Sequence, residues 1–244
     1  MRALRIVLII AVILGGLFVA ADRIAVGFAE DEAAERLRTS EGLAQTPDVS
    51  IKGFPFLTQV AGGELDDVEV GIDGFEASNG GGKVRIDELT AKMRGVAFSD
   101  DYSSATAAEA SGSARIAYDE LLKAAKVEPV QVAPGVTAKV VGLSDGGNGK
   151  IKVAIEATVL GKTLPRPVEV VSSATVEGGK RVQVHADALP KLGAVAIAEQ
   201  RMRQITDFQQ VIDGLPAGIK LDKVEAAPDG VSVTVTGSQV KLVG

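Results

Sequence analysis

The one enzyme-like motif in the chain is the segment 142–146, which has the Gly-x-Ser-x-Gly spacing of a serine hydrolase nucleophile turn. That turn needs a strand before Ser144 and a helix directly after it, because amides at the helix end stabilise the oxyanion. Here turn residues (147–150) and a strand pattern follow instead. The single histidine, His185, alternates with apolar neighbours and is predicted on the polar face of a strand. We interpret the motif as a hairpin turn, and a serine esterase using Ser144 is the weakest of three functional hypotheses.

Three other motifs have the outline of a ligand site but lack a residue that the chemistry requires. No Ser or Thr follows Lys83 in the glycine-rich segment 79–83, so this segment does not match a phosphate-binding loop. Segment 145–156 has the length of a calcium loop without its ligand and turn-glycine positions. The acidic pairs at 66–67 and 100–101 are typical of solvated surface. Since the chain also has no cysteine, we predict no catalytic residue, no metal site and no cofactor.

Composition excludes one class of partner and describes the core. The 244 residues carry a formal net charge of −6, and basic residues do not cluster outside the N-terminal end. Nucleic acid is therefore excluded as a partner, because binding phosphates needs concentrated positive charge. Hydrophobic residues make up 46% of the chain but aromatic residues only 4%. The core must come from many aliphatic side chains, a composition that favours strands.

Alternating apolar residues predict antiparallel strands joined by hairpins, with turn residues at 144–150 and 177–180. The alternation changes phase twice within 84–98, as bulges or bends would require, so we expect a strongly curved sheet. Segment 105–117 alternates with small apolar residues, which allow another element to approach closely. The predicted strands lie at 49–51, 68–72, 84–98, 105–117, 136–141, 151–159, 168–176, 182–186, 219–224 and 231–235, with a short helix at 118–126.

The period becomes helical between residues 192 and 212, where the apolar stripe includes Met202, Ile205 and Phe208. The sequence Asp-Gly-Leu-Pro that follows would end this helix, whose length would be about 32 Å. No Gly/Pro/Ser linker divides the chain. The sequence therefore predicts one α+β domain over 41–244, in which a strongly curved antiparallel β-sheet wraps against the long amphipathic α-helix.

Residues 1–21 begin with Arg2 and Arg5 and continue as an uncharged apolar run, which predicts a signal or signal-anchor helix. Two outcomes stay open. A cut after the small pair Ala20-Ala21 would release the protein, whereas apolar spacings of three and four through 22–40 predict an amphipathic helix that continues from the first. In either case the positive flank stays cytoplasmic and the remainder is translocated. We expect an extracytoplasmic protein, anchored by the N-terminal helix or secreted after signal cleavage.

The segment Gly53-Phe54-Pro55-Phe56-Leu57-Thr58-Gln59 concentrates aromatic residues in a chain that has few. Pro55 favours an extended conformation at the residue before it, so a stiff segment presents both rings. Two interpretations stay open. The rings cap one end of the core as a plug, or they border the mouth of an apolar cavity in which acyl chains replace part of the packing.

At this motif the chain resembles a known family. Residues 51–75, IKGFPFLTQVAGGELDDVEVGIDGF, are similar to the signature of the LmeA-like phospholipid-binding proteins of high-GC Gram-positive cell envelopes. The resemblance implies an extracytoplasmic, non-enzymatic protein with a fold akin to tubular lipid-binding domains. It implies binding of phospholipid, including phosphatidylinositol-type lipids, and support for assembly of lipid-anchored envelope glycans. Only 53–59 corresponds residue by residue, and the resemblance assigns no ligand role to any of these positions.

Together these patterns predict a membrane-proximal protein that holds phospholipid between the concave sheet and the 192–212 helix. The predicted lipid-binding residues are Phe54, Pro55, Phe56 and Leu57 at the entrance, and Met202, Ile205 and Phe208 on one wall. The second hypothesis is a fully packed interaction module that holds an envelope partner, such as a membrane glycosyltransferase, through its surface.

Overall fold

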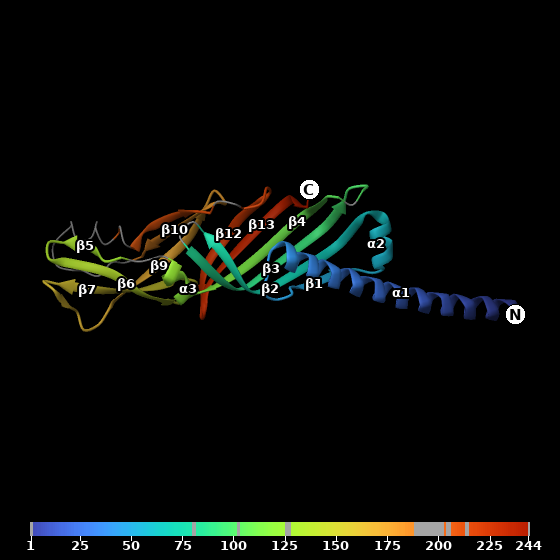
Figure 1. Ribbon diagram of the computed structural model, residues 1–244, viewed down its shortest axis with the longest axis horizontal. Helices are drawn as coiled ribbons and strands as arrows, with labels where there is room; N and C mark the ends of the chain where they lie inside the picture. Colours follow the sequence, from blue (N-terminus) through green and yellow to red (C-terminus); the bar gives the residue numbers. More distant parts are fainter. Residues whose placement is uncertain are drawn as a thin grey trace. The chain divides into compact units, whose positions relative to one another are not determined.

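The computed structural model describes residues 2–79, 82–101, 103–124, 128–187, 203, 206–212 and 215–243. It confirms the predicted α+β fold class, because a long N-terminal helix is followed by mostly antiparallel strands in strongly curled sheets. Figure 1 shows these elements coloured along the chain. Short helices interrupt the strands after β1 and β4.

The helices are α1 (Arg2–Ser40), α2 (Phe56–Gly62) and α3 (Tyr118–Ala124). The strands are β1 (Asp48–Lys52), β2 (Glu64–Asn79), β3 (Gly82–Phe98), β4 (Ala105–Ala117), β5 (Val130–Ala133), β6 (Val136–Asp145), β7 (Ile151–Val159), β8 (Lys162–Thr163), β9 (Val168–Glu177), β10 (Arg181–Ala186), β11 (Phe208–Val211), β12 (Ile219–Ala227) and β13 (Gly230–Val243). One sheet has the order β1-β2-β3-β4-β13-β12, and the other has the order β11-β10-β9-β7-β6-β5 with β8 paired to β7.

The chain divides into two compact units. Unit 1 contains residues 1–72, 90–111 and 237–244, and unit 2 contains residues 73–89 and 112–236. Four strands, β2, β3, β4 and β13, contribute residues to both units. The single domain expected over 41–244 remains a prediction.

Unit 1 is built around the contact of α1 with β1 and α2 (Figure 1). Val26 of α1 and Phe56 of α2 are buried in one apolar cluster, together with Leu65, Val96, Ala105 and Ala107 from the strands. β1 lies at the edge of its sheet, and the Ile51 amide donates a 2.7 Å hydrogen bond to the Glu30 carboxylate of α1. The helix therefore supplies both apolar contacts and a hydrogen-bond acceptor to this edge strand.

Unit 2 has an aliphatic core, as the composition predicts. On β7 the inward-facing residues are Ile151, Val153, Ile155 and Ala157, all buried, and they alternate with more accessible side chains. Ile151, Val153 and Ile155 pack in one cluster with residues of β5, β6, β9, β10, β12 and β13, among them Val132, Ala138, Val170 and Val224. Tyr118 of α3 donates a 2.7 Å hydrogen bond to the Ala227 carbonyl, which ties this helix to the end of β12.

The prediction that the 192–212 segment is helical up to its end is wrong. Residues 188–202 and 204–205 lie outside the described residues, but Phe208–Val211 form β11, which pairs antiparallel with β10. Pairing continues past the strand, because the Ile212 amide donates to the Lys180 carbonyl at 2.8 Å. The apolar spacing at 208 and 212 suits a helix, yet β10 offers a row of backbone partners to this segment, and that tertiary pairing decides its conformation.

Three charged side chains on neighbouring strands of unit 1 form a cluster, and this cluster makes the stability of the unit depend on pH in the acid range. Glu69 on β2 accepts from Lys52 on β1 at 2.5 Å and from Lys92 on β3 at 2.8 Å. These hydrogen bonds lower the pKa of Glu69 from 4.5 to about 2. Because the folded-state pKa is depressed, the stabilisation is complete above about pH 4.3 and is lost as the pH falls toward 2.

We predict that Lys92→Gln makes the protein less sensitive to acid, although it is less stable at neutral pH. Without Lys92 the pKa of Glu69 returns part of the way toward its ordinary value, so less stabilisation is lost on acidification. The measurement is the thermal unfolding midpoint of the full chain in detergent at neutral pH and at about pH 3. Lys241→Gln, at an exposed lysine of β13, is the control. An unchanged acid response in Lys92→Gln would contradict the role of this cluster.

Candidate functional site

The aromatic loop lies beside the place where α1 changes character. Along α1 the large apolar side chains from Leu4 to Val19 are exposed, and Asp22 is the first charged residue after the apolar run. Among the described residues, α1 contains a stretch long and apolar enough to cross a membrane. The helix therefore fits a signal or a membrane anchor, and Asp22 marks the end of its apolar part.

Asp22 joins this point of α1 to the loop. Its carboxylate is completely buried, and Oδ1 accepts a 2.9 Å hydrogen bond from the backbone N–H of Leu57. Leu57 is the second residue of α2, whose first amides have no partner within the helix. Pro55, the N-cap residue, provides no side-chain hydrogen bond. A side chain from α1 therefore caps α2, and Arg23 balances the charge by donating from Nη2 to Asp22 Oδ2 at 2.6 Å.

Other residues of the segment 53–59 hold the loop in shape. Gly53 has a φ of +97°, and a Cβ there would meet Gln59 Nε2 at 2.6 Å and Asp66 Oδ2 at 2.7 Å, so only glycine fits. The Asp66 amide donates to Gln59 Oε1 at 2.8 Å, and Thr58 Oγ1 donates to the Pro55 carbonyl at 2.9 Å. The Phe54–Pro55 peptide bond is cis. The polar and glycine positions of this motif are thus explained by local structure.

The two phenylalanines lie in opposite environments. Phe56 is only 7% exposed and packs in the core of unit 1, which is the place that the plug interpretation expects for this ring. Phe54 is 57% exposed and Leu57 is 37% exposed. The Arg23 guanidinium carbon lies 5.3 Å from the centroid of the Phe54 ring, within the range of a cation–π contact. One ring therefore stabilises the fold, and the other presents an apolar surface to its surroundings.

The predicted wall residues and the loop belong to different parts of the chain. Met202 and Ile205 lie outside the described residues. Phe208 is a strand residue of β11 in unit 2, whereas Phe54, Phe56 and Leu57 belong to unit 1. A shared lining of one cavity by these two groups remains a prediction. Asp22 and Arg23 also belong to the site, and their only signal in the sequence is their position directly after the apolar run.

Ser144 and His185 are not paired as the nucleophile and base of a hydrolase would be. Ser144 on β6 lies opposite Lys152 of β7, and His185 on β10 lies opposite Ser173 of β9. β6 and β10 are separated by β7 and β9, so three strand spacings, about 14 Å, lie between Ser144 and His185. The turn after Ser144 leads to β7 rather than to a helix. The Gly-x-Ser-x-Gly spacing therefore marks a hairpin, as expected.

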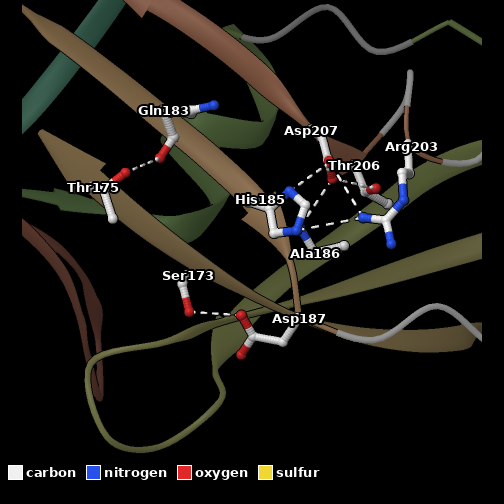
Figure 2. Close-up of polar contacts among 9 residues, drawn as sticks. All are labelled: Ser173, Thr175, Gln183, His185, Ala186, Asp187, Arg203, Thr206 and Asp207. Atoms are coloured by element: carbon white, nitrogen blue, oxygen red, sulfur yellow. Dashed lines mark hydrogen bonds and ion pairs between the residues drawn. The ribbon is translucent and has the colours of Figure 1, made fainter. Parts of the chain in front are cut away.

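His185 is instead part of a polar cluster at the edge of unit 2, drawn in Figure 2. Its Nδ1 lies 2.7 Å from Asp207 Oδ2, and its Nε2 lies 3.4 Å from Arg203 Nη1. Partial burial opposes ionisation of Asp207, but hydrogen bonds from the Ala186 amide and the Thr206 hydroxyl, with the nearby imidazole, hold its pKa below the ordinary value. This cluster fixes the chain that leads into β11 against β10.

An open groove of about 480 Å³, with both polar and apolar lining, lies in unit 2. Its two lysines are both engaged by carboxylates, since Lys150 Nζ lies 2.6 Å from Asp187 Oδ2 and Lys223 Nζ lies 2.5 Å from Glu225 Oε2. Ser173 also donates to Asp187, at 2.7 Å (Figure 2). The groove therefore has mixed, mutually compensated charge and offers no concentrated positive site for a phosphate.

The structure predicts unequal effects of truncating the two rings. Phe56→Ala should lower the free energy of unfolding by about 3–5 kcal/mol, the usual cost of removing a buried aromatic side chain. Phe54→Ala should change it by no more than about 0.5 kcal/mol, since its ring is mostly exposed. Urea unfolding of the full chain in detergent, followed by circular dichroism, measures both. Equal losses in the two variants would contradict the assignment of inner and outer rings.

Comparison with known proteins gives one match. The family model described as LmeA-like phospholipid-binding matches residues 20–236, nearly the whole chain. No curated protein and no solved structure shows a significant match. The matched region begins inside α1 at Ala20 and therefore includes Asp22, the aromatic loop, most of unit 1 and all of unit 2. The chain belongs to the LmeA-like phospholipid-binding family.

Proposed function

We propose that this protein is an extracytoplasmic, non-enzymatic phospholipid-binding protein of the cell envelope, held at the membrane by α1. It takes up the acyl chains of a phospholipid in an apolar cavity and supports the assembly of envelope lipids or lipoglycans. The observation that carries the proposal is membership of a phospholipid-binding family over nearly the whole chain. Phosphatidylinositol-type lipid is the proposed ligand class, and an envelope glycosyltransferase is the proposed protein partner.

The aliphatic interior supports acyl-chain binding. Each methylene transferred from water to an apolar environment contributes about 0.8 kcal/mol, so two long chains bind well without a strong head-group site. Around the core of unit 2, several aliphatic side chains are only partly buried and offer such an environment: Val136, Val140, Leu143, Val176, Val182 and Val233. Mobile chains can pack against small aliphatic groups without a specific shape, and aromatic residues are too few to fill the interior alone.

Native mass spectrometry of the full chain, released from detergent micelles, tests lipid binding. We expect a population heavier by the mass of one phospholipid, which lipid extraction then identifies. Phe54→Asp at the proposed entrance should reduce this population, whereas Leu160→Asp, at an 82% exposed leucine of unit 2, should not. A protein without lipid in every preparation would favour the packed interaction module, whose two apolar clusters would then account for the whole interior.

The anchor is tested separately by the intact mass of the protein purified from the membrane fraction. We expect the mass of the complete chain, because α1 runs without interruption from Arg2 to Ser40 and the side chain directly after Ala21 is buried against the loop. Recovery of a soluble protein that starts at Asp22 would show that the helix is a signal peptide and would leave the lipid-binding proposal intact.

A further inference from the structure

Several exposed apolar residues lie close to Asp22, where the apolar part of α1 ends. This position indicates which environment surrounds them. Phe54 and Leu57 are exposed on the loop, and Ile24 of α1 is 61% exposed. We call Ile24, Phe54 and Leu57 the collar. Single exposed apolar side chains are common on proteins, but these three lie close to the end of the apolar segment of α1: Ile24 follows Asp22 by two residues, Leu57 is bonded to Asp22, and Phe54 contacts Arg23.

One hydrogen bond and one cation–π contact hold the loop residues of the collar beside Asp22 and Arg23 of α1. The Leu57 amide lies 2.9 Å from Asp22 Oδ1, and the Arg23 guanidinium carbon lies 5.3 Å from the Phe54 ring centroid. Ile24 is two residues beyond Asp22, about 3 Å along the helix axis at 1.5 Å per residue. The collar therefore lies at the level where the apolar part of α1 ends, with no flexible linker between helix and loop.

A helix in a bilayer places the end of its apolar segment at the boundary between hydrocarbon and head groups. At that boundary large apolar side chains such as Phe and Leu insert into the outer part of the acyl layer. Arginine keeps its charge in the head-group layer while its stem lies along apolar surface. Arg23, which is bonded to Asp22 and stacked on Phe54, has this combination of contacts. If water surrounded the collar instead, two large aliphatic side chains and an aromatic ring would be exposed to it beside a membrane anchor.

We propose that the collar is a membrane seat, in which Ile24, Phe54 and Leu57 insert into the interface of the bilayer that holds α1. The occupant of this surface is the outer boundary of the lipid layer itself, not a protein partner. The proposal rests on the proposed anchoring by α1. It shares Phe54 and Leu57 with the proposed cavity entrance but does not require the cavity. It adds a second lipid contact, to the bilayer rather than to a bound lipid, and it places unit 1 directly on the membrane surface.

The chain contains no tryptophan, so a single introduced Trp reports on one position only. Phe54→Trp, Ile24→Trp and Leu160→Trp are each reconstituted as the full chain in phosphatidylcholine nanodiscs, with or without phospholipid brominated near the head-group end of its acyl chains. Leu160 is the matched control, because it is also an exposed apolar residue but lies in unit 2. We expect blue-shifted emission and quenching by brominated lipid at positions 54 and 24, and water-like, unquenched emission at position 160.

Two results would overturn the seat. Water-like, unquenched emission at 54 would show that this ring lies outside the bilayer, facing solvent or a protein partner. Quenching at 54 without quenching at 24 would show contact with a single bound lipid instead of the bilayer, which would favour the cavity entrance and remove the seat. Leu57→Trp provides an independent reporter on α2 should Phe54→Trp fail to fold, with the same expected quenching. The seat and the cavity thus fail separately, since lipid uptake is measured by mass and insertion by quenching.

Discussion

A buried carboxylate at the end of an apolar helix organises the N-terminal part of this protein. An ionised group removed from water is costly unless it is paired and hydrogen-bonded, and Asp22 has one partner from its own helix and one from the loop. The Leu57 amide is an orphan donor at the start of α2, so this contact supplies the amide with an acceptor and the carboxylate with a partner besides Arg23. The helix end, the aromatic loop and the core beneath them form one packed structure as a result.

The aromatic motif places one ring in the core and the other on the surface, and the sequence alone does not tell which ring is which. Phe54 and Phe56 are equally apolar and only two residues apart, but Pro55 lies between them and α2 begins at Phe56. The ring that follows the proline enters the core, and the ring that precedes it stays outside beside Arg23. At the level of sequence the rings either cap the core as a plug or border the mouth of an apolar cavity. In the structure Phe56 is buried in the core and Phe54 is exposed, and a cavity mouth at Phe54 remains a prediction.

Much of the architecture follows from residue patterns, and the exceptions have identifiable causes. Strict alternation on β7 fixed the buried face correctly, because a strand with one face in a core must place Ile151, Val153 and Ile155 together. The apolar spacing near Phe208 gave the wrong element, since pairing with β10 is a tertiary interaction that local spacing does not contain. The division into two units leaves no linker in the sequence, because β2 and β3 run continuously through both. Asp22 was visible only as the charge that ends an apolar run, since its partner is 35 residues away.

The bond from the Ile51 amide to Glu30 has a consequence for solubility. β1 is the outermost strand of its sheet, and such a strand offers unpaired donors and acceptors to any other extended chain. The carboxylate of Glu30 occupies one of these donors, and α1 packs alongside β1. The helix therefore hinders edge-to-edge pairing with another chain. A molecule that lost residues 22–40 together with the apolar run would thus acquire a free sheet margin, and self-association rather than simple release from the membrane would follow.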